Sequence, residues 1–154
     1  MDEAVRLAEE TGNPSSLVVA LGALGFAQLG LGRHQEAAET LGQALAAGRS
    51  HHAGLFEEGF LLADLAQARF GLGDRDGART TASDAVEVTR HQGARAVECF
   101  ALLTRARIVR ATGGPAADID ADLDAALALA RDMGATAYEA DAEAIRAGAD
   151  VAPQ

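Results

Sequence analysis

The histidines are the side chains of this chain best suited to bind a transition metal. His51 and His52 are adjacent, and adjacent side chains at a helix end point to different sides, so a metal site would need further ligands. His91 could approach them if neighbouring helices stack in register, but the sequence contains no cysteine pair and no His-x-x-x-His spacing to complete the set. We therefore expect these histidines to be solvated turn residues, and the sequence predicts no metal site.

Alternating aspartates between residues 118 and 124 imitate the start of a calcium-binding loop. Such a loop needs glycine at its sixth position and a bidentate glutamate at its twelfth, whereas Leu123 and Leu129 stand at those positions. Asp118 and Asp120 instead fall early in a predicted helix, where carboxylates stabilise the positive end of the helix dipole. The sequence therefore predicts no calcium site.

The remaining motifs do not support catalysis. The Gly-Leu-Gly segments at 30–32 and 71–73 resemble part of a dinucleotide-binding loop, but no strand precedes either one and the third glycine is missing. The chain has no lysine to hold a phosphate, and the hydroxyls within 80–83 have no histidine and carboxylate at a useful spacing. Cys99 lies alone in a helical pattern, as a small buried hydrophobe does. We predict a non-catalytic protein without a cofactor.

Regularly spaced turns indicate the elements that hold these residues. Similar alanine-rich segments lead to turns at positions 12, 52, 93 and 134, in steps of 40, 41 and 41 residues, and a fixed period of this size predicts a solenoid. A second set of breaks, near 30–32, 71–74 and 112–115, divides each unit into two helices, because glycine ends helices in the left-handed conformation. The predicted helices are 2–11, 15–30, 34–49, 54–71, 75–92, 95–112, 116–133 and 136–148.

We thus expect an all-α fold, an antiparallel helical-hairpin solenoid of about eight helices. Its 154 residues suffice for a single domain with a proper core. The predicted divisions are a half repeat at 1–13, repeats at 14–53, 54–94 and 95–135, and a capping helix with its tail at 136–154.

Small residues recur where paired helices must approach closely. Those on the first helices are Gly25, Ala66 and Ala106, and those seven apart on the second helices are Ala37 and Ala44, then Ala78 and Ala85. This pattern, with its glycine turns, resembles the tetratricopeptide repeat (TPR) family over nearly the whole chain. Leu21 and Leu62 stand where that family has an aromatic residue, and its terminal proline is absent.

The repeat is longer than the usual TPR unit of about 34 residues, and its period alone also fits HEAT-like repeats. The longer unit is similar to helical-repeat regions of large bacterial multidomain regulators, where such arrays follow an ATP-binding signalling module. The segment 126–134, Ala-Leu-Ala-Leu-Ala-Arg-Asp-Met-Gly, is typical of those regions. The resemblance implies an interaction module in a bacterial signalling or transcriptional protein.

Composition limits the partners. The net charge is −10 and all 13 basic residues are arginine, so binding to nucleic acid or to an anionic membrane is disfavoured. The apolar runs are too short to span a membrane, and the N-terminus lacks the pattern of a secretory signal. With a single cysteine, we expect a cytoplasmic location.

Aromatic side chains are confined to the predicted first helices: Phe26, Phe56, Phe60, Phe70, Phe100 and Tyr138. The TPR resemblance implies that first helices line a concave face. On that pattern the candidate partner-binding residues are Phe26, Phe60, Gln67, Phe70, Phe100, Arg107 and Arg110. Aromatic and arginine side chains suit an apolar, acidic peptide. The alternative is that each phenylalanine is ordinary inter-helix core.

Two functions compete. The first is a scaffolding module that binds a protein or peptide segment, including its own upstream domain. The second is a stand-alone adaptor that forms a homodimer through the N-terminal helix, which lacks a hairpin partner and carries Val5, Leu7 and Ala8. An enzyme is a third interpretation, which none of the motifs supports.

Overall fold

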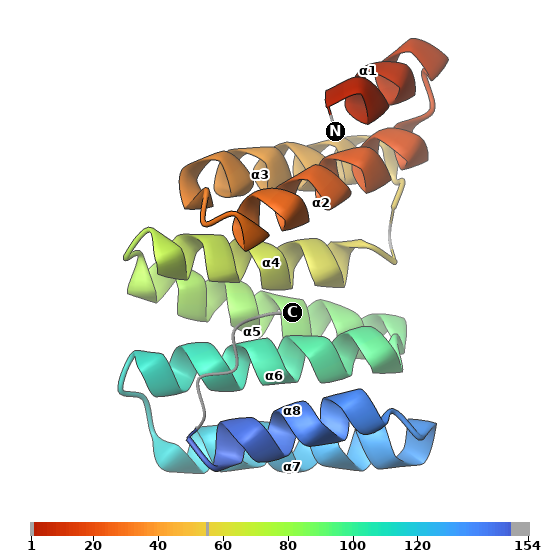
Figure 1. The fold of residues 1–154 in the computed structure, drawn as a ribbon. Coiled ribbons are helices and arrows are strands. Elements are labelled where there is room, and N and C mark those ends of the chain that lie inside the picture. The colour runs from red at the N-terminus through yellow and green to blue at the C-terminus, as the bar shows by residue number, and fades with distance from the viewer. Residues whose placement is uncertain (1, 55, 149–154) are drawn as a thin grey trace.

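The computed structural model describes residues 2–54 and 56–148, and every regular element in those two ranges is an α-helix (Figure 1). The helices are α1 (Asp2–Thr11), α2 (Pro14–Gly30), α3 (His34–His51), α4 (Glu58–Gly71), α5 (Arg75–Gln92), α6 (Arg95–Ala111), α7 (Ala116–Met133) and α8 (Thr136–Arg146). The prediction of an all-α fold with about eight helices is confirmed. No helix in the described part is long and apolar enough to cross a membrane.

Helix ends follow the local chemistry of the sequence. The side chain of Asn13 accepts hydrogen bonds from the backbone N–H groups of Ser15 and Ser16, at 3.0 and 3.3 Å, and so caps the start of α2. Asp74 caps α5 in the same way, through the N–H of Gly77 at 2.9 Å. Helices α5 and α7 end at glycines with positive φ, whereas α3 ends at His52, a non-glycine residue with φ of 50°.

The start of α4 differs from the prediction of a helix from residue 54. Gly54 has a φ of +65°, which a right-handed helix excludes, and a Cβ at this position would lie only 2.6 Å from Val18. The helix therefore begins at Glu58, and Phe56 lies in the preceding turn with 75% of its surface exposed. The placement of Phe56 on a first helix was wrong. The predicted tail beyond residue 148 lies outside the described residues.

The helices form two layers. Each helix contacts the next one along the chain, and α2, α4, α6 and α8 also contact each other in succession, whereas α3, α5 and α7 make no such contacts among the described residues. In Figure 1, α2 lies in front of α3 and α8 lies in front of α7. The even-numbered helices from α2 to α8 are therefore neighbours along one side of the molecule. We call these helices the first layer, and α3, α5 and α7 the second layer.

Close contacts between the layers depend on small residues. Ala37, Ala44 and Leu41 on α3 are fully buried. A Cβ on Gly25 of α2 would lie 2.6 Å from Cγ of Leu41, so only glycine allows the two helices to approach this closely. The small residues identified in the sequence thus lie in the helix contacts, as expected.

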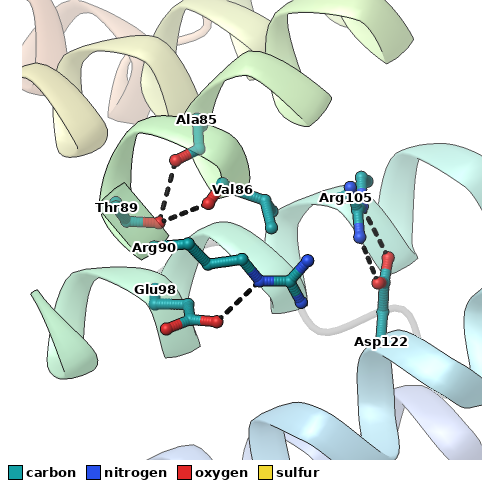
Figure 2. A network of polar contacts seen from close by, with 7 residues as sticks. All are labelled: Ala85, Val86, Thr89, Arg90, Glu98, Arg105 and Asp122. Atoms are coloured by element: carbon teal, nitrogen blue, oxygen red, sulfur yellow. Dashed lines mark hydrogen bonds and ion pairs between the residues drawn. The ribbon is translucent and has the colours of Figure 1, made fainter. Parts of the chain in front are cut away.

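A repeated ion pair joins each helix of the second layer to the start of the next helix. The pairs are Arg49–Glu58 at 2.9 Å, Arg90–Glu98 at 2.9 Å and Arg131–Glu139 at 3.6 Å. Figure 2 shows the middle pair. All three arginines are half-exposed or more, so each pair contributes about 1 kcal/mol or less to the free energy of unfolding. The pairs therefore matter more for how successive helices are positioned than for stability. Their spacing follows the repeat, a signal that the sequence analysis missed.

Candidate partner-binding face

The candidate site is the side of α2, α4 and α6 that faces away from α3, α5 and α7, here called the inner face. Three contacts show which side of α4 belongs to the inner face. Ala66 belongs to a buried cluster with residues of α5, Phe60 stacks on a phenylalanine of α6, and Leu61 packs beside a glycine of α2. Asp64 lies opposite Ala66, two residues and about 200° away around the helix, so it marks the middle of the inner face.

The phenylalanines divide into exposed and packed side chains. Phe26 is 50% exposed, Phe60 39% and Phe70 36%. Phe70 follows Ala66 by one helical turn, so it lies on the side of α4 toward α5 and not on the inner face. Phe100 is half-buried, packs against the main core and stacks on Phe60 with 5.4 Å between ring centroids. Phe100 is therefore part of the inter-helix core, whereas Phe26 leaves half of its aromatic surface exposed on the inner face.

The inner face is uncharged along α2. This helix contains no acidic or basic residue, and Ala23 and Val19 are exposed one and two turns before Phe26. A run of exposed apolar side chains on one helix face is typical of a surface that a partner covers.

The two candidate arginines differ in their contacts. Arg107 on α6 donates to Asp141 of α8 at 3.2 Å, and its Nε is buried without a hydrogen-bond partner. Arg110, one turn later and partly exposed, makes no ion pair with any described residue. Arg110 is thus the more available cation, while Arg107 is already partly neutralised.

Gln67 has a role that the sequence did not indicate. Its Nε2 donates to Oδ1 of Asp64 at 3.3 Å. Asp64 is only 7% exposed, and it makes no ion pair with any described residue. Burial raises the pKa of its carboxyl group from 3.8 to about 7. The signal available in the sequence was an acidic residue inside the otherwise apolar segment 59–66.

The proposed self-association residues do not share one surface. Ala8 is 7% exposed and Val5 packs against the core, whereas Leu7 is 48% exposed. Of the three, Leu7 alone offers a free apolar side chain.

The residues considered for metal binding and nucleophilic chemistry lie apart from the inner face or are buried. His51 and His52 are exposed, and the described residues contain no group of three or more metal-binding side chains. Cys99 is fully buried, and its thiol donates to the carbonyl of Ala126 at 3.4 Å. Burial raises the pKa of this thiol to about 11, so the nucleophilic thiolate is disfavoured. Asp118 and Asp120 are exposed in the first turns of α7.

No protein-family model matches the sequence, and a search of curated proteins finds no match to it. The resemblance to TPR proteins therefore remains a prediction.

Proposed function

We propose that this chain is a TPR-like interaction module, an antiparallel helical-hairpin solenoid that binds a protein or peptide segment on its inner face and catalyses no reaction. The observation that carries the proposal is the exposed aromatic surface of Phe26 and Phe60 on α2 and α4. Aromatic side chains, phenylalanine included, are enriched in protein interfaces relative to the rest of the protein surface.

The solenoid interpretation is supported by the repeated contacts. Successive helices of the first layer pack on each other, and the same arginine–glutamate pair recurs at the end of α3, α5 and α7. Stacked units of this kind present an extended surface along one layer, which suits a peptide or a helix of another protein.

The partner carries apolar and acidic side chains. The apolar ones pack on the phenylalanines, and a carboxylate pairs with Arg110, which lacks an ion-pair partner among the described residues. The net charge of −10 disfavours nucleic acid as the ligand. The partner is a segment of another protein or an upstream domain of the same polypeptide, in a cytoplasmic bacterial regulator.

The test is selection of random peptides displayed on phage against the folded chain. Selected peptides should bind the wild-type chain and lose binding to Phe26→Ser. Phe56→Ser is the matched control, because Phe56 is even more exposed but lies in the turn before α4. Peptides that bind Phe26→Ser as well as wild type, or that lose binding equally in both variants, would contradict the proposal.

A further inference from the structure

We propose that Asp64 is the recognition site for an arginine side chain of the segment that binds the inner face. This inference rests on the proposed function and names one chemical group of its partner. It adds a cation-binding point to a surface that otherwise selects apolar and acidic side chains.

The chain contains a second buried carboxylate, and that one does have a cationic partner. Asp122 of α7 is 5% exposed, and Arg105 of α6 satisfies both of its oxygens, with Nε–Oδ2 at 2.8 Å and Nη2–Oδ1 at 2.5 Å (Figure 2). Asp64 is buried to a similar extent but has no cation beside it among the described residues. A buried carboxylate without a cationic partner is costly in its ionised form. A guanidinium from a bound segment would therefore stabilise the ionised form of Asp64, which has only the hydrogen bond from Gln67.

Thr104 of α6 is a buried polar residue at the same level of the first layer as Asp64. Thr104 follows Phe100 by one helical turn on α6, as Asp64 follows Phe60 on α4, and the two phenylalanines stack on each other. Thr104 therefore lies at the level of Asp64. It is 1% exposed, and its Oγ1 is buried with no hydrogen-bond partner. A guanidinium has five donors in a planar fork, so it can serve a carboxylate and a hydroxyl oxygen together, which a compact ammonium does less well.

The side chains near Asp64 also favour a cation at this position. Phe60 lies one turn before it on α4 and stacks on Phe100 of α6, and aromatic rings attract a cation. Gln67, which is half-buried, covers the carboxyl through a single long hydrogen bond of 3.3 Å that a stronger donor can replace. Arg110 lies beyond, near the end of α6. The bound segment is thus oriented, with its arginine at Asp64 and its carboxylate toward Arg110.

The test uses ethylguanidinium as the probe, in a nuclear magnetic resonance titration of the isotope-labelled chain at about pH 8, above the pKa of Asp64. We expect a saturable shift of the Asp64 carboxyl carbon and of the amides of Gln67 and Thr104. Asp64→Asn should weaken the fitted affinity about tenfold. The control Asp84→Asn, which removes an exposed carboxylate from α5, should leave the affinity unchanged.

Two further probes identify the chemistry. Ethylurea, which is neutral, should cause no saturable shift, and ethylammonium should bind more weakly than ethylguanidinium. Equal binding of ethylammonium, or shifts that persist in Asp64→Asn, would overturn the inference, as would the absence of a saturable shift at Asp64. Because the probe contains no apolar peptide, such a result leaves the phage selection and the Phe26→Ser comparison as a separate test of the proposed function.

Discussion

Replacing Asp64 by asparagine should stabilise the fold, and the gain should grow with pH. The substitution keeps the shape of the side chain and an oxygen that accepts the hydrogen bond from Gln67, but removes the charge. In the folded chain burial raises the pKa of Asp64 to about 7, whereas the unfolded value is 3.8. Below the unfolded value the carboxyl is protonated in both states, and the ionised form costs nothing.

As pH rises through this window the unfolded state loses its proton before the folded state does. The wild-type free energy of unfolding therefore falls from about pH 4 and levels off above about pH 7. A difference of about three pKa units corresponds to about 4 kcal/mol at most, at about 1.4 kcal/mol for each unit. Between about pH 5 and pH 8.5 the advantage of Asp64→Asn should increase by about 3 kcal/mol.

Urea unfolding followed by circular dichroism at the two pH values measures this advantage directly. The exposed Asp84→Asn variant reports the effect of removing one surface charge from an acidic chain, and its effect should change little with pH. A gain for Asp64→Asn that is the same at both pH values would refute the assignment of Asp64 as an uncompensated buried carboxyl group.

Three other perturbations test the packing, the buried ion pair and the alternative function. Gly25→Ala should destabilise the fold by about 1–3 kcal/mol in urea unfolding, because the added Cβ overlaps α3, whereas Gly42→Ala, where a Cβ meets nothing, should be neutral or stabilising by up to about 1 kcal/mol. Arg105→Met should cost about 3–5 kcal/mol in the same assay because it leaves Asp122 buried without a cation, and a loss below 1 kcal/mol would show that the pair is solvated. The homodimer alternative predicts a dimer in sedimentation that Leu7→Glu converts to a monomer, and a monomeric wild-type chain removes that alternative.

Most helix boundaries could be predicted because glycine recurs at the breaks. Gly93 and Gly134 have the left-handed conformation that ends α5 and α7, and this preference is local to the residue. The start of α4 could not be predicted in the same way. Gly54 adopts its positive φ beside Val18, and that contact exists only after α2 and α4 have packed.

The positions of Phe26 and Phe60 on helices of one layer follow from the repeat, and both side chains are exposed. Their role in binding a partner stays a prediction. The burial of Asp64 could not be predicted, because it depends on how α4 packs between α2 and α6, which contact it in the folded chain. In the sequence alone, Asp64 is one carboxylate among 23 acidic residues.

The central claim is that the inner face binds a protein segment through its exposed aromatic side chains. The most direct measurement is the dissociation constant of one phage-selected peptide, determined by fluorescence anisotropy, for wild type, Phe26→Ser and Phe56→Ser. Loss of a buried aromatic anchor costs about 2 kcal/mol or more, so binding to Phe26→Ser should weaken at least about tenfold. Binding to Phe56→Ser should equal that of wild type. Equal dissociation constants for wild type and Phe26→Ser would contradict the claim.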